Sequence, residues 1–177
     1  MRGLNVLPWL IPGLILSSII GLVVGKRVGQ ALRASSAVGW ALVLGFGLIV
    51  SATLTPLRGG LELDATGIGA CDLSRFGLAP LQLLLRFSDQ SLNVLLFIPL
   101  GIAIGLVPGS RRKRVLAGMA VLLPVAIEAT QSLVPVLGRG CQSGDVFDNL
   151  TGLLLGLLIG TGARLSYGGV APSEEPR

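Results

Sequence analysis

Five long apolar runs dominate the chain, and they restrict its fold more than any other feature. They cover residues 4–24, 38–57, 92–107, 115–137 and 146–162. A helix needs about 20 apolar residues to cross a bilayer. Only 13% of all residues are charged and the mean hydropathy is +0.80, whereas soluble domains carry about 25% charged residues. The sequence therefore predicts an all-α integral membrane bundle of about five transmembrane helices.

The first run has an alternative interpretation as a cleaved signal peptide, because Arg2 precedes it. The run is long and no clear small-x-small cleavage site follows it, so we favour a retained helix. We divide the chain into an extra N-terminal helix with a basic loop (1–36), a membrane domain (37–165) and a polar tail (166–177). The tail composition predicts disorder.

Residues 58–90 form a polar segment between the second and third runs, too mixed in character to cross a membrane. Its apolar part at 78–87 is too short for a span and fits an interfacial or re-entrant segment. We expect the rest to form a loop on one side of the membrane.

The basic residues predict the orientation of the bundle. They cluster after the first, third and fifth runs, at Lys26, Arg27, Arg33, Arg111, Arg112, Lys113, Arg114 and Arg164. With five helices these three places share one side, and an excess of basic residues marks the cytoplasmic side. We therefore expect the N terminus outside and the C terminus in the cytoplasm. The pI near 10.2 then reflects anchoring beside anionic lipid, and we predict no nucleic-acid partner.

Two polar residues interrupt the fourth run. Glu128 and Gln131 are three positions apart, so a helix places them on one face. If the helix continues to Leu137, Glu128 lies about 13 Å below its outer end, at roughly 1.5 Å per residue. A charge facing lipid at that depth costs at least about 2.5–3.5 kcal/mol. Glu128 is therefore expected to be protonated, paired, or turned toward an aqueous cavity.

Other polar residues are expected to converge on the same outer end from three helices and one loop. Together the candidate ligand-binding residues are Asn93, Glu128, Gln131, Arg139, Asp145, Asp148 and Asn149. One interpretation is a structural lock, in which Glu128 and Gln131 bond to Asn149 and Arg139. The other is a site that binds or transforms a lipid head group or another envelope molecule, because ionisable groups inside a membrane are usually functional.

Catalysis at this cluster would use Glu128 or Asp145 as general base, although no nucleophile motif accompanies them. The chain has no histidine, which excludes imidazole acid–base chemistry and His-ligated metals. Carboxylate and amide oxygens suit Mg²⁺ or Ca²⁺, but their spacing matches no known metal loop. We predict no metal and no cofactor.

Glycines recur at every fourth position on two runs. Gly152, Gly156 and Gly160 lie on the fifth run, and Gly21, Gly25 and Gly29 follow the same spacing at the end of the first. Such faces let helix backbones approach closely. We favour packing within the chain over a dimer interface, and the oligomeric state stays open.

Cys71 and Cys141 are the only cysteines, and both fall on the predicted outer side. An oxidising compartment and an even count predict a disulfide, with two free thiols as the alternative. The bond would pull the 58–90 segment over the polar residues as a lid.

Three stretches resemble the VanZ-like family. They are NVLLFIPLG at 93–101, IEATQ at 127–131 and GRGCQSGDVFDNLTGLLLG at 138–156. Residues on the family signature are Asn93, Glu128, Gln131, Arg139, Asp145, Asn149, Gly152 and Gly156. The LAPL stretch around Pro80 matches more loosely. The resemblance covers roughly residues 37–164 and leaves the first run outside.

The resemblance implies a small multi-pass protein of the bacterial cytoplasmic membrane. The founding member of the family is linked to resistance toward the glycopeptide teicoplanin by an unknown biochemical route, which does not imply that this chain confers resistance. Three functions remain open at this point. They are binding of an anionic lipid or lipid-linked cell-wall precursor, an enzyme acting on such a molecule, and a structural bundle.

Overall fold

The computed structural model describes residues 7–57, 71–86 and 88–168. In chain order the elements are α1 (Leu10–Leu32), α2 (Ser36–Thr53), β1 (Cys71–Asp72), α3 (Leu81–Leu84), α4 (Asp89–Leu106), α5 (Ser110–Leu133), the 3₁₀ turn η1 (Pro135–Leu137), β2 (Cys141–Gln142) and α6 (Ser143–Gly168). Five of them, α1, α2, α4, α5 and α6, are long and apolar enough to cross a membrane. The predicted five-helix membrane bundle is confirmed.

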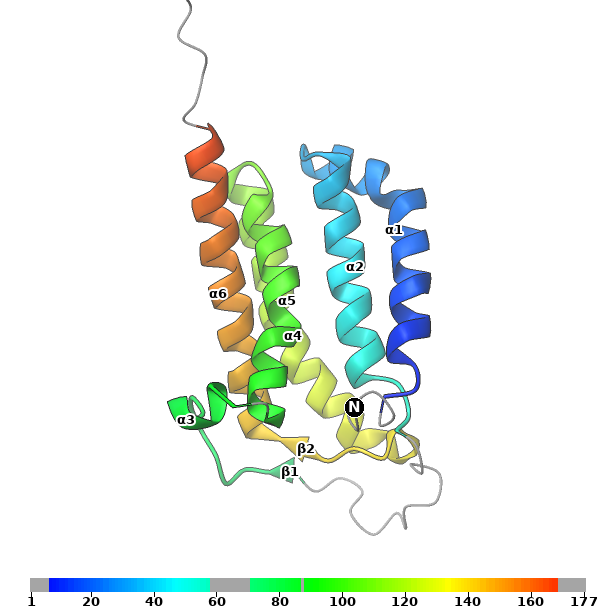
Figure 1. The fold of residues 1–177 in the computed structure, drawn as a ribbon, viewed down its shortest axis with the longest axis vertical. Helices are drawn as coiled ribbons and strands as arrows, with labels where there is room; N and C mark the ends of the chain where they lie inside the picture. Colours follow the sequence, from blue (N-terminus) through cyan, green and yellow to red (C-terminus); the bar gives the residue numbers. More distant parts are fainter. Residues whose placement is uncertain (1–6, 58–70, 87, 169–177) are drawn as a thin grey trace, which may run out of the picture.

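The five long helices form two groups (Figure 1). The α1–α2 hairpin stands on one side and α4, α5 and α6 on the other. Within the described ranges α1 packs on α2, α2 on α4, and α4 on α6. The hydrophobic core lies where α2 and α6 pack against α4. Its residues Ile49, Phe97, Ile104 and Leu153 are almost fully buried.

The two ends of the bundle differ in character. The α1–α2 turn, the α4–α5 turn and the end of α6 lie together at one end (Figure 1). We call this the basic end, because Arg33, Arg111 and Arg164 lie there. The short elements α3, β1 and β2 lie at the opposite end, which we call the cluster end. This separation of basic turns from acidic residues is the arrangement expected from the sequence.

The first helix begins and ends later than predicted. It spans Leu10–Leu32 rather than 4–24, and residues 4–6 of the predicted run lie outside the described part. Lys26 and Arg27 are therefore on its last two turns and not in a loop, with both side chains exposed. The helix continues because Gly25 and Gly29 still contact α2, while long basic side chains near a helix end reach the interface.

The later helices also differ from their predicted bounds. The chain turns back into α5 at Ser110, so the run at 111–114 is helical, and α5 ends at Leu133. Helix α6 continues to Gly168, which makes residues 166–168 of the predicted tail helical; 169–177 lie outside the described residues. The segment at 78–87 holds only the four-residue helix α3 at the cluster end (Figure 1), and residue 87 is outside the described part.

Both rows of glycines pack against another helix of the same chain. A Cβ at Gly152, Gly156 or Gly160 would collide with a backbone carbonyl of α4. On α1 the corresponding face meets α2, where a Cβ at Gly25 would lie 2.9 Å from the backbone nitrogen of Trp40. Packing between membrane helices depends on such close contact, because lipid is as apolar as the side chains.

Gly156→Ala tests the α4–α6 contact. The added methyl group must displace the carbonyl oxygen of Ile98, and overpacking of this kind costs about 1–3 kcal/mol. The matched control is Gly162→Ala on the same helix, because nothing lies within 4 Å of a Cβ there. Thermal unfolding of the purified protein in detergent should show a lower Tm for Gly156→Ala only. Equal Tm values would contradict the close contact.

Candidate functional site

The predicted polar residues gather at the cluster end of the bundle. Asn93 lies on the second turn of α4, Glu128 and Gln131 on the last two turns of α5, and Arg139 between η1 and β2. Asp145, Asp148 and Asn149 occupy the first two turns of α6. We call these seven residues the polar cluster.

Glu128 holds the chain where it enters α6. Its side chain is only 5% exposed, and its Oε2 accepts a hydrogen bond of 2.8 Å from the backbone N–H of Gln142. Asp145 and Arg139 lie near enough for their charges to act on this carboxylate. Because α5 ends at Leu133, Glu128 lies about 7–8 Å from the helix end, which is shallower than the sequence indicates.

The side chains of Gln131 and Arg139 donate hydrogen bonds to the C-terminal end of α2. The side-chain amide of Gln131 donates to the carbonyl of Thr53 at 3.0 Å, and the Arg139 guanidinium donates to the carbonyl of Ala52 at 2.5 Å. The last carbonyls of a helix have no partner within it, and an unpaired carbonyl is costly in a membrane. The structural lock predicted that Glu128 and Gln131 bond to Asn149 and Arg139. In the structure Gln131 and Arg139 instead bond to backbone carbonyls of α2.

Arg139 is partly buried and carries a positive charge. Within the described ranges it forms no ion pair, and its Nε has no hydrogen-bond partner. Burial lowers the pKa of the Arg139 guanidinium from its ordinary value, and the negative charge of Glu128 opposes that shift. A guanidinium keeps its proton in proteins, so a positive charge remains at this end of the bundle.

Asp145 and Asn149 share one stripe of α6 with the packing glycines. They are four residues apart and precede Gly152 and Gly156 on the face toward α4. The Asn93 side chain interacts with Asp145. Asn149 is 1% exposed, and its Oδ1 has no hydrogen-bond partner in the part of the chain that the structure describes.

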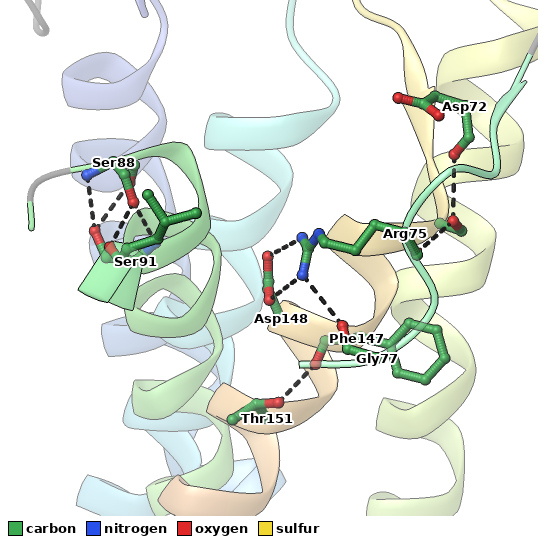
Figure 2. Close-up of polar contacts among 10 residues, drawn as sticks. Asp72, Arg75, Gly77, Ser88, Ser91, Phe147, Asp148 and Thr151 are labelled. Carbon is green, nitrogen blue, oxygen red and sulfur yellow. Dashed lines mark hydrogen bonds and ion pairs between the residues drawn. The ribbon is translucent and has the colours of Figure 1, made fainter. Parts of the chain in front are cut away.

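Asp148 has a partner that sequence reasoning missed. Figure 2 shows the guanidinium of Arg75 donating to both oxygens of the Asp148 carboxylate, at 3.1 and 2.5 Å. Asp148 is 1% exposed and Arg75 is 28% exposed. This hydrogen bond raises the pKa of Arg75 above its ordinary value. A signal existed in the sequence, since a disulfide between Cys71 and Cys141 brings the residues that follow Cys71, including Arg75, close to the start of the fifth run.

A covalent strap carries Arg75 to this position. Cys71 and Cys141 form a disulfide, as predicted, and β1 pairs with β2 in parallel. Ser143 fixes the strap further, because its hydroxyl donates to the carbonyl of Arg75 at 2.8 Å. We call residues 71–77 the strap. It brings a cation from the loop after α2 to the start of α6.

Metal binding has no geometric support within residues 7–57, 71–86 and 88–168. No group of three or more Cys, Asp or Glu side chains there is arranged to hold an ion. The polar cluster offers hydrogen-bonding and charged groups, which are Asn93, Glu128, Arg139, Asp145 and Asn149.

The fold and the cluster define a small multi-pass membrane protein with a polar site at one end. A family model described as VanZ/LLP1 matches residues 37–164. The chain belongs to this family, which confirms the resemblance carried by the motifs, and α1 lies outside the match. No curated protein and no solved structure matches the chain.

Arg75→Gln tests the role of the strap. Removing one partner of a buried ion pair costs about 3–5 kcal/mol, because it leaves an uncompensated charge. Since Arg75 is 28% exposed and solvent screens it, we expect about 1–3 kcal/mol. The matched control is Arg86→Gln, an exposed arginine without an ion pair among the described residues. Tm in detergent should fall for Arg75→Gln alone, and a fall equal to that of the control would refute this role.

Proposed function

We propose that the protein binds the head group of an amphiphilic envelope molecule at the cluster end. The proposed ligand is an anionic lipid or a lipid-linked cell-wall precursor, bound on the outer side of the bacterial cytoplasmic membrane. The observation that carries the proposal is that two buried atoms of the polar cluster, Arg139 Nε and Asn149 Oδ1, have no hydrogen-bond partner among the described residues.

The proposal starts from the polar groups that the fold itself does not use. Gln131 is bonded to α2 and Asp148 to Arg75. An unpaired buried donor or acceptor costs about 1–3 kcal/mol. In the part of the chain that the structure describes, Arg139 Nε is such a donor and Asn149 Oδ1 such an acceptor. A ligand that offers both an acceptor and a donor would remove this cost, whereas a purely structural cluster would keep it.

The charges of the cluster indicate what the ligand carries. Arg139 suits an anionic oxygen such as that of a phosphate. The carboxylates of Glu128 and Asp145 accept hydrogen bonds and disfavour a second anion, so the part of the ligand near them should carry hydroxyl or amine donors. A phosphorylated head group with hydroxyl or amine groups meets both conditions.

The outward direction of the site is part of the proposal. It rests on the basic turns at the opposite end, which by the positive-inside rule face the cytoplasm. The link of the family's founding member to teicoplanin resistance supports an envelope ligand, and a role of this chain in glycopeptide resistance is a further step of the proposal.

An enzymatic role is the second candidate. The hydrogen bond from Gln142 N–H occupies one oxygen of Glu128, which favours a holding role for that residue. Asp145, beside Asn93, is then the better placed general base. A purely structural cluster is the third candidate, and it is the one that the unpaired atoms disfavour.

Asn149→Leu separates binding from structure. Leu has a similar size, and replacing an unpaired buried polar group by an apolar one is neutral or stabilising. We expect Tm to be kept while lipid binding is lost. The measurement is mass spectrometry of lipids that co-purify with the full-length protein. Thr151→Val is the control, because its hydroxyl bonds only within the helix, to the Phe147 carbonyl. A lipid profile unchanged in Asn149→Leu would refute the site.

Glu128→Gln distinguishes binding from catalysis. The amide oxygen of Gln can still accept from Gln142 N–H, so the local fold should be kept while the charge is removed. Lipid analysis of a deletion strain complemented with each variant gives the readout. Restoration by Glu128→Gln and Asp145→Asn as well as by the wild type supports binding. A precursor that the wild type removes but that accumulates with Asp145→Asn or Glu128→Gln, with variant protein present at wild-type level, would favour the enzyme.

A further inference from the structure

A second site lies in the other half of the bundle. A cleft of about 440 Å³ lies between the α1–α2 hairpin and helices α4 and α5, and the residues that line it are all apolar. Residues on its walls include Val28, Leu32, Leu42, Phe46, Leu116 and Ala120. We propose that this cleft holds an acyl chain of an anionic phospholipid whose head group binds Arg33 and Arg112. The proposal is independent of the polar cluster.

The cleft follows from the way the two helix groups meet. Helix α2 packs against α4, for which Gly45 allows the α4 backbone at Leu100 to come close. Neither α1 nor α2 packs closely against α5 in the described chain. The apolar side chains of α5 that face the hairpin, Leu116, Ala120 and Leu123, therefore line a gap rather than a close helix contact.

A lipid acyl chain is the occupant that fits this apolar cleft. Apolar cavities of this kind hold no water, and the surrounding solvent at this depth is hydrocarbon. From Leu116 to Leu123 the α5 wall extends about 10 Å along the helix axis, so a length of acyl chain can lie against it. The volume of the cleft is also within the range of about 300–1,000 Å³ that is usual for ligand pockets.

Charge complementarity determines the head group. Arg112 is four residues before Leu116, so it lies on the same face of α5 one turn nearer the basic end. Arg33 directly follows Leu32, the last lining residue of α1. Neither arginine forms an ion pair or a side-chain hydrogen bond with the described residues. Basic groups at the mouth of a cleft between membrane helices attract anionic lipid head groups.

The test compares phosphatidylglycerol with phosphatidylcholine of identical acyl chains, titrated onto the full-length protein in detergent and followed by native mass spectrometry. The wild type should bind phosphatidylglycerol more tightly. The double variant Arg33→Gln/Arg112→Gln should lose about fivefold in affinity for each charge removed. Arg114→Gln, an exposed arginine two residues from Arg112 and hence on another face of α5, should change affinity much less.

A filling substitution tests the acyl-chain half of the proposal. Ala120→Phe places a ring in the cleft and should weaken phosphatidylglycerol binding at least tenfold. Leu122→Phe, on the exposed face of the same helix, should leave it unchanged. Equal binding of the two lipids by the wild type, or equal effects of each variant and its control, would overturn the proposal. If Ala120→Phe does not fold, the arginine variants decide the question alone.

Discussion

The backbone contact between α4 and α6 is the interaction on which the rest of the structure depends. Gly152, Gly156 and Gly160 leave room for the carbonyls of α4, and in lipid such close packing replaces the hydrophobic driving force. The same stripe of α6 carries Asp145 and Asn149 toward α4. Through this contact Asn93 meets Asp145. Asp148, one position before Asn149, lies on a different side of α6 and pairs with Arg75 of the strap.

The cluster end is then completed by polar groups that satisfy one another. Gln131 and Arg139 bond to the last carbonyls of α2, Glu128 accepts from the chain entering α6, and Arg75 pairs with Asp148. The bonds of Gln131, Arg139 and Arg75 join elements that are more than 70 residues apart in the sequence, so together they hold the end of the bundle in place. Among the described residues this network leaves Arg139 Nε and Asn149 Oδ1 unpaired, and the proposed ligand would pair with them.

Much of this could be predicted from the sequence because composition and spacing record it directly. Five apolar runs predict five helices, the glycine spacing predicts close packing, and two cysteines on one side predict the disulfide. The ends of the helices could be predicted less well, since α1 continues to Leu32 only because α2 packs against its last turns. The partners of the polar residues could not be predicted, because Gln131 bonds to a backbone carbonyl and Arg75 meets Asp148 across 73 residues.

The central claim is that the polar cluster faces outside while the basic end faces the cytoplasm. Single cysteines at Gln82 on α3 and at Arg111 on α5, both exposed, report on the two ends, and the native cysteines stay bonded to each other. In intact cells a membrane-impermeant maleimide should label Gln82→Cys and reach Arg111→Cys only after permeabilisation. Labelling of Arg111→Cys in intact cells, with Gln82→Cys protected, would contradict the account.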